Sequence, residues 1–372
     1  MAGLYLHIPF CKRVCAYCDF YKSADLRPMK AVVAAMHDEL RREAGFLPER
    51  RLRTIYFGGG TPSLLPPEEL EEFIAHAAEL FDCTALEECT VEANPDDLTP
   101  DYLRRLARTR IDRLSIGIQS FDDGELRLMN RRHTAGAARN AVRQAQEAGF
   151  GNVTVDLIFG VPGFGAETLV RNLRETVALG VQHVSAYHLT VEPDTAFGRR
   201  MARGTFAPVA EEVSEEEFLT VHRTLCDAGF EHYEVSNFAL PGRRAIHNSA
   251  YWHGDPYLGI GPAAHSFDGE CRRWAVADIG HYLAGGDRYE SEQLTERDRY
   301  NETVMTALRT ADGLDTEAIG RRFGAARREA LLDAARPWLD AGDAVLHGGR
   351  LAIPAERFLL SDAVITALFW EC

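Results

Sequence analysis

Short apolar segments alternate with helical patterns along the first 190 residues of this 372-residue chain, and no other feature restricts the fold as much. The pattern repeats about every 30–40 residues, as expected for βαβ units around a parallel sheet. The predicted strands are 4–8, 54–57, 89–92, 113–118, 153–158 and 183–189, and the predicted helices lie near 29–44, 67–80, 100–108, 135–148 and 166–178. Six units are too few for a closed eight-stranded barrel, so the pattern leaves an open barrel or a doubly wound sheet.

Polar and glycine residues stand where these strands end. Ligands of either architecture bind beyond the carboxyl ends of the strands. The residues at these ends are 58–61 after the second strand, 92–94 at the third, 119–120 at the fourth, Asp156 within the fifth and 187–188 at the sixth. The sequence therefore predicts a ligand site at this edge of the sheet.

Three cysteines, Cys11, Cys15 and Cys18, fall within eight residues directly after the first strand. A disulfide would use two of them and leave the third unpaired. A structural zinc ion usually takes four protein ligands, and His7 is the only nearby residue that could be the fourth. An iron–sulfur cluster held by three thiolates would leave one iron open to a small molecule.

The spacing C-x3-C-x2-C, with Tyr17 just before the last cysteine, resembles the radical S-adenosylmethionine (SAM) superfamily. The segment from Tyr5 to Phe20 more closely resembles the oxygen-independent coproporphyrinogen oxidase group, and within it the haem-chaperone branch. The resemblance implies an open (β/α)6 partial barrel of the TIM type. It also implies a [4Fe–4S] cluster held by the three cysteines, with exchangeable SAM on the fourth iron. We expect Phe10, Tyr17 and Phe20 to keep water away from such a cluster.

The glycine run Gly58-Gly59-Gly60-Thr61 offers a backbone that a ligand can approach closely, although alone it could be an ordinary turn. It resembles the superfamily segment that holds the amino group of SAM, which implies roles for Gly59, Gly60 and Thr61. The loop after Gly163 departs from the family pattern, because it reads Phe164-Gly165. We assign no contact to that loop.

The family pattern implies further SAM contacts, which are Tyr5, Tyr17 against the adenine, Glu92, Gln119, Arg131 and Asp156. Arg132 is adjacent to Arg131 and could take its place. Glu92 and Asp156 lie in apolar strands, where an unpaired charge is costly. Alternatively, these two carboxylates form internal salt bridges with Arg131 or Arg113.

Beyond residue 190 the pattern changes, with a helix predicted over 209–228 and a strand over 232–238. His247-Asn-Ser-Ala-Tyr251-Trp252 then resembles the HNxxYW motif of the haem-chaperone branch. The resemblance implies haem ligation by His247, with the two aromatic rings packing on the porphyrin. A structural histidine is the alternative, and His253 and His265 are further candidate ligands.

The chain divides into residues 1–230 as the barrel, 231–294 as a connecting segment with the motif, and 295–372 as a C-terminal α-rich domain. Helices fit 295–309, 314–322, 325–341 and 356–370, and a hairpin fits 344–353. This combination indicates a winged-helix-like module. The net charge of −15 argues against nucleic acid as its partner. The absence of an apolar run long enough for a membrane span and of a secretory signal leads us to expect a cytoplasmic protein.

Two main functions follow from the resemblance. The first is a haem chaperone that binds haem, the cluster and SAM and delivers haem to an acceptor such as a respiratory, membrane-associated haem enzyme. It would also need an electron donor, and dimerisation is left open. The second is coproporphyrinogen III oxidase of porphyrin biosynthesis. The oxidase has a further cysteine where this chain has Phe20, and an extension ahead of the cluster loop where this chain has ten residues. Both differences favour the chaperone.

Two other hypotheses about the function remain. Another radical SAM enzyme would also explain an intact-looking SAM site, so whether the chain is an enzyme is undecided, and no catalytic residue is assigned. A zinc-stabilised α/β protein is the fourth alternative.

Overall fold

The computed structural model describes residues 2–285 and 289–371. Its main feature is a twelve-stranded sheet with the order β12-β11-β10-β9-β1-β2-β3-β4-β5-β6-β8-β7. The six central strands are parallel and follow chain order: β1 (Ala2–Ile8), β2 (Leu52–Gly59), β3 (Glu88–Ala93), β4 (Arg113–Gln119), β5 (Val153–Phe159) and β6 (His183–His188). Because β1 pairs with β9 and β6 pairs with β8, the barrel is open, as predicted.

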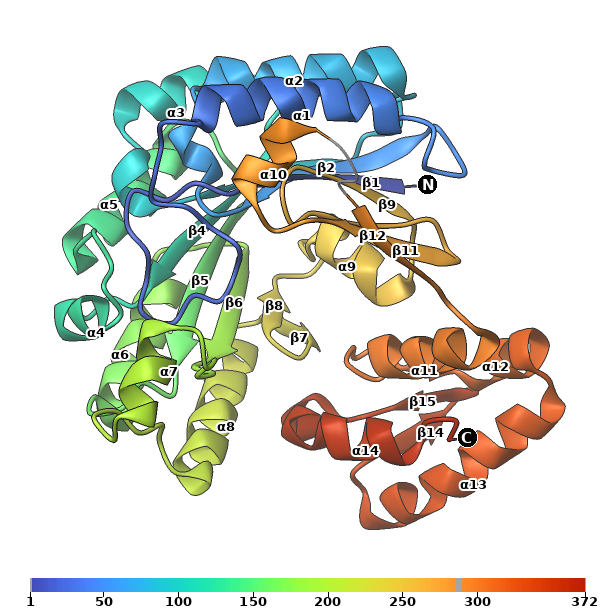
Figure 1. Cartoon of the computed structure of the whole chain (residues 1–372). Helices are drawn as coiled ribbons and strands as arrows, with labels where there is room; N and C mark the ends of the chain where they lie inside the picture. The colour runs from blue at the N-terminus through green and yellow to red at the C-terminus, as the bar shows by residue number, and fades with distance from the viewer. Residues whose placement is uncertain (1, 286–288, 372) are drawn as a thin grey trace.

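Helices form the outer layer of the barrel (Figure 1). They are α1 (Met29–Glu43), α2 (Pro67–Leu80), α3 (Pro100–Leu106), α4 (Asp123–Leu128), α5 (Ala135–Glu147) and α6 (Gly165–Ala178). The strands are buried on both faces, which explains their nearly continuous apolar sequences; Leu4 and Leu6 of β1 are fully buried beside Ile55 and Phe57 of β2. The short 3-10 turns η1 (Pro62–Leu64) and η2 (Pro95–Asp97) follow β2 and β3.

Residues 231–294, predicted as a connecting segment, extend the sheet at both edges. The expectation of one strand over 232–238 is wrong, because β7 (Glu231–Glu234) and β8 (Asn237–Ala239) form an antiparallel hairpin. At the other edge lie β9 (Tyr257–Ile260), β10 (His265–Phe267), β11 (Cys271–Ala275) and β12 (Tyr289–Gln293). Four helices lie between β6 and the C-terminal domain: α7 (Ala196–Ala202), α8 (Glu211–Asp227), α9 (Ile246–His253) and α10 (Ile279–Ala284).

The C-terminal domain, orange to red in Figure 1, has the predicted winged-helix-like order. It contains α11 (Glu296–Ala307), β13 (Leu314–Asp315), α12 (Thr316–Phe323), α13 (Ala325–Ala341), β14 (Val345–His347), β15 (Arg350–Ala352), η3 (Ala355–Leu360) and α14 (Ser361–Ala367). The last predicted helix, 356–370, is shorter than expected because its first part is the 3-10 turn η3. No helix in the described part of the chain is long and apolar enough to cross a bilayer.

The C-terminal domain is fastened to both edges of the sheet. Arg272 of β11 makes a bidentate ion pair with Glu302 of α11, with N–O distances of 2.8 and 2.9 Å. At the other edge, Glu234 of β7 forms an antiparallel β-bridge with Thr310. The C-terminal domain therefore contacts strands near both ends of the sheet order.

Candidate functional site

The three motif cysteines lie on the loop between β1 and α1, residues 9–28, which we call the cluster loop. All three are free thiols. The Cys11 amide donates to the carbonyl of Ser23 at 3.0 Å, so the two ends of the loop are joined. The Ala16 amide donates to the carbonyl of Met129 at 3.0 Å, which fixes the middle of the loop to the segment after α4.

Two of the sulfur atoms receive hydrogen bonds. Thr61 Oγ1 donates to Cys11 Sγ at 3.4 Å, and Arg131 Nη1 donates to Cys15 Sγ at 3.3 Å. Burial raises the pKa of Cys11, so the free thiol is the stable form without a metal. Donors directed at sulfur stabilise coordinated thiolates and tune an iron–sulfur cluster, so this donor set fits one.

His7, the candidate fourth ligand of a zinc site, has both ring nitrogens in hydrogen bonds. Nδ1 pairs with the Tyr5 hydroxyl at 3.1 Å, and Nε2 with the carbonyl of Tyr21 at 3.2 Å. Burial lowers the pKa of His7 to about 4, so the ring is neutral near pH 7. The zinc alternative therefore loses its fourth ligand in this structure.

The predicted aromatic shield around the cysteines is only partly present. Phe10 is fully buried and Tyr17 is half-buried against the core. Phe20, however, is 70% exposed, so its predicted shielding role is wrong. It lines a large cleft between the sheet and the C-terminal domain.

The glycine run ends β2 directly beside the cluster loop. Gly59 has φ +106°, and a Cβ there would lie 2.7 Å from the His7 ring. A Cβ on Gly60 would lie 2.7 Å from the backbone of Phe10. Close approach of the two loops thus requires glycine at both positions. The Gly59 amide donates to Glu92 Oε2 at 3.1 Å, so it is already engaged within the protein.

Glu92 and Asp156 do not form the predicted alternative salt bridges to Arg131 or Arg113 within the described residues. Glu92 instead accepts from the Tyr56 hydroxyl at 2.8 Å, and Asp156 from Ser115 Oγ at 3.2 Å. Burial, with a smaller contribution from Asp156, raises the pKa of Glu92 to about 7. The pKa of Asp156 is likewise raised by burial. Two carboxyl groups this poorly solvated are suited to bind a ligand's hydroxyl or ammonium groups.

Arg131, rather than Arg132, faces the cluster loop. Its Nη2 donates to Asn94 Oδ1 at 2.6 Å, whereas Arg132 pairs with Asp96 and Asp97 after β3. Asn94 also donates to Thr61 Oγ1 at 3.2 Å, so it links residues that contact two of the sulfur atoms. Sequence reasoning did not select Asn94, although its position at the end of β3 was the available signal.

Gln119, at the end of β4, has φ +67°, a left-handed conformation that is uncommon for a residue other than glycine. Its side chain is buried, and its amide nitrogen lies near Gly117. Strain of this kind often occurs at ligand sites. Of the predicted SAM contacts, Thr61 and Arg131 donate to sulfur atoms of the cluster loop and Tyr17 belongs to that loop. Four others lie on the neighbouring strands: Tyr5, Glu92, Gln119 and Asp156.

His247, the predicted haem ligand, lies inside the protein with 2% exposure. Its Nδ1 pairs with Thr54 Oγ1 at 2.7 Å and its Nε2 with the Tyr251 hydroxyl at 2.9 Å. The ring stacks on Tyr56 at a centroid distance of 4.9 Å. Both nitrogens are occupied in this structure, so ligation of haem iron by His247 would require at least one of these hydrogen bonds to break.

A cavity of about 940 Å³ opens between the sheet and the C-terminal domain, and we call it the interdomain cleft. Tyr5 and Phe20 line it near the cluster loop, and Trp252, His253 and His265 line it along α9 and β10. Its other wall is formed by α11 and α12. The cleft therefore joins the cluster side of the barrel to the C-terminal domain, and it holds the two other candidate histidines.

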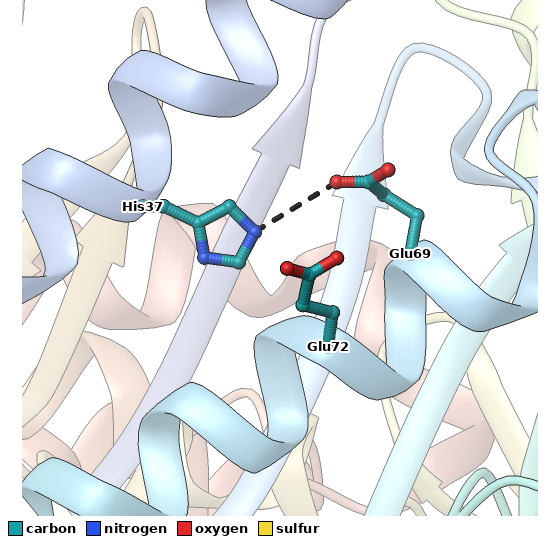
Figure 2. A group of neighbouring side chains, drawn as sticks. All are labelled: His37, Glu69 and Glu72. Atoms are coloured by element: carbon teal, nitrogen blue, oxygen red, sulfur yellow. Dashed lines mark ion pairs between the residues drawn. The ribbon is translucent and has the colours of Figure 1, made fainter.

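A separate group of possible ligands lies on the outer helices (Figure 2). His37 of α1 faces Glu69 and Glu72 of α2, and one ligand atom from each lies within 4.8 Å of the others. The His37 ring stacks on Phe73 at 3.8 Å. This group belongs to the packing between α1 and α2 and stands apart from both the cluster loop and the interdomain cleft.

Comparison with known families agrees with this geometry. Residues 5–176 match the radical SAM superfamily, and residues 294–360 match the HemN C-terminal domain. Heme chaperone HemW of Mycobacterium tuberculosis is 37% identical, with 98% of this chain and 94% of that protein covered. Heme chaperone HemW of Lactococcus lactis is 35% identical, with 86% and 84% covered.

The chain belongs to the HemW family. The fold agrees with coproporphyrinogen III oxidase (HemN) from Escherichia coli, with a TM-score of 0.84 at 22% identity, covering 99% of this chain and 90% of that one. As a radical SAM protein, a HemW-family chain carries a [4Fe–4S] cluster and SAM. Cys11, Cys15 and Cys18 would hold the cluster, and a reduced cluster of this kind would be able to supply one electron to bound SAM.

Proposed function

We propose that this protein is a haem chaperone that binds haem and delivers it to acceptor proteins. Relatives named heme chaperone HemW, at 32–37% identity over most of the chain, support this function. The observation that carries it is the interdomain cleft, which has the size of a site for a large ligand and lies beside the cluster loop. The oxidase alternative is not favoured by these relatives.

The interdomain cleft suits a flat, apolar ring with a polar edge. Aromatic side chains line it from three elements: Trp252 of α9, Tyr257 of β9 and Phe323 of α12. Aromatic faces pack well against a porphyrin, while the cleft stays open to solvent for exchange with a partner.

We further propose His265 as the axial ligand of haem iron in place of His247. His265 is exposed, lines the cleft, and stacks on Trp274 at 5.8 Å without a side-chain hydrogen bond among the described residues. Partial burial lowers its pKa, which favours the neutral imidazole that binds iron. His247, by contrast, could reach iron only after losing its bonds to Thr54 and Tyr251.

The haem ligand can be tested by absorbance titration of haem into anaerobically reconstituted protein. We expect His265→Ala to weaken haem binding at least tenfold and to change the Soret band. His253→Ala is the matched control, because this histidine also lines the cleft, and it should bind normally. If a folded His247→Ala variant lost haem while His265→Ala kept it, our assignment would be wrong and the motif histidine would be the ligand.

The chaperone and oxidase functions are separated by incubating the same preparation with coproporphyrinogen III. We expect stable haem uptake and no protoporphyrinogen IX. Conversion of coproporphyrinogen III would contradict the chaperone function. This expectation rests on the family resemblance, which implies an additional cysteine in the oxidase at the position where this chain has Phe20.

The identities of the acceptor and the electron donor, the assembly and the compartment are proposals as well. We propose a respiratory haem enzyme, some of which are membrane-associated, as the acceptor, together with an electron donor for the cluster and a homodimer as the working assembly. We propose the cytoplasm as the compartment, because the cluster thiols must stay reduced. The three-part division at residues 230 and 294 remains our proposal for the domain limits. No nucleic-acid partner is proposed.

A further inference from the structure

Two arginines of the C-terminal domain line the interdomain cleft with side chains that have neither a carboxylate nor a backbone carbonyl as partner among the described residues, whereas a third, Arg350, donates to the carbonyls of Asp312 and Gly313. Arg299 lies on α11 and Arg322 on α12. Neither side chain has a carboxylate within ion-pair distance among the described residues, and Arg322 only lies over the Phe323 ring at 5.1 Å.

The carboxylates of the same wall are already engaged. Glu302 is held by Arg272, and Asp312 pairs with Arg244 at 3.1 Å. Asp315 accepts from the Ala318 amide at 2.9 Å as the N-cap of α12. Asp255, which forms no ion pair among the described residues, belongs to the opposite wall between α9 and β9. On the wall made by α11 and α12, the carboxylates are thus held by other protein groups, whereas Arg299 and Arg322 form no ion pair among the described residues and are free to meet a ligand.

We infer that Arg299 and Arg322 bind the two propionate groups of haem, so that the C-terminal domain recognises the anionic edge of the cargo. This inference rests on the proposed function. Haem carries both propionates on one edge of the ring, and guanidinium groups are the side chains best suited to bind carboxylates. With the anionic edge held on this wall, Trp252 would be placed to pack against the apolar ring and His265 of β10 would be the cleft-lining candidate for the iron.

The two walls of the cleft thus have separate roles. The barrel wall contributes the aromatic and imidazole contacts, whereas the C-terminal wall contributes charge recognition. Partly desolvated charge–charge contacts add specificity for an anionic ligand and speed its capture. Neutralising the propionates should therefore weaken binding even when the tetrapyrrole ring is unchanged.

The test compares haem with haem dimethyl ester, in which both propionates are uncharged, using absorbance titrations of cluster-loaded protein at low salt. We expect wild-type protein to bind haem at least tenfold more tightly than the diester. Arg299→Gln combined with Arg322→Gln should abolish most of this preference and leave diester affinity within twofold of wild type. The double lysine variant, R299K with R322K, should retain part of the preference, because it keeps the charges.

The matched control is Arg108→Gln with Arg203→Gln, which removes the same charge from exposed arginines outside the cleft. It should keep the wild-type preference. The inference fails if wild-type protein binds both ligands equally, if the R299Q/R322Q variant keeps the preference, or if that variant weakens both ligands equally. Failure of wild-type protein to bind either ligand would instead contradict the proposed function itself.

Discussion

At the scale of single residues, Glu92 shows how burial prepares a side chain for a ligand. It accepts hydrogen bonds from Tyr56 and Gly59, yet these do not compensate for its loss of hydration, and its pKa rises to about 7. An ammonium or hydroxyl group of a bound ligand would supply the missing partner. Sequence alone could predict an acidic residue at this strand end, but the shift depends on packing across β2 and β3.

The raised pKa of Glu92 predicts a specific pH dependence of stability. The folded state holds this proton up to about pH 7, whereas the unfolded chain releases it near pH 4.5, so stability falls as pH rises through that window. We expect Glu92→Gln to flatten the fall, which in wild type amounts to at most roughly 3 kcal/mol for this group. Denaturant unfolding without SAM at pH 5 and pH 7.5 measures it. The prediction would be contradicted if the free energy of unfolding changed equally between the two pH values in wild type and in the variant.

At the scale of elements, the N-terminus of α9 is held by β3. Glu88 accepts from the amides of Ile246 and His247 at 2.9 Å each and lies 3.7 Å from the guanidinium of Arg113. Glu88 and Arg113 are both almost completely buried. This pair thus fixes α9, the helix that carries the HNxxYW motif, at the amino-terminal end of β3.

Breaking that pair should be costly. We expect Glu88→Gln to lower the free energy of unfolding by about 3 kcal/mol, because the charge of Arg113 is left buried and unpaired. Glu87→Gln is the control, since Glu87 pairs with Arg53 at the surface and should contribute less than about 1 kcal/mol. Urea denaturation measures both, and similar losses in the two variants would contradict a special role for the buried pair.

The sequence predicted the elements of the barrel well and the later segments less well. The βα alternation and the polar strand ends are local patterns, so the parallel strands and the neighbourhood of Thr61, Glu92 and Arg131 could be foreseen. Two features depend on contacts that are distant in sequence. The shielding role of Phe20 is wrong, because its side chain is exposed at the interdomain cleft. Haem ligation by His247 stays a prediction, and sequence alone could not show that Thr54 and Tyr56 of a distant strand pack around its ring.

At the scale of the whole molecule, the Arg272–Glu302 pair sets how firmly the C-terminal domain closes over the cleft. It is the bidentate contact between β11 and α11. We expect Glu302→Gln to accelerate haem dissociation several-fold and to increase hydrogen exchange in α11. Glu292→Gln removes an exposed contact of the same arginine at 3.3 Å and should change neither quantity. Unchanged exchange and dissociation in Glu302→Gln would show that this contact does not hold the domain.

The pairing of β1 with β9 has a consequence for how the protein matures. Residues 3–6, which lead directly into the cluster loop, are completed on one side by residues 257–260. A ribosome must therefore make about two thirds of the chain before the first strand acquires its second neighbour. Although synthesis begins with the cysteine motif, we expect iron and sulfide to be retained only late in translation, or after the chain has been released.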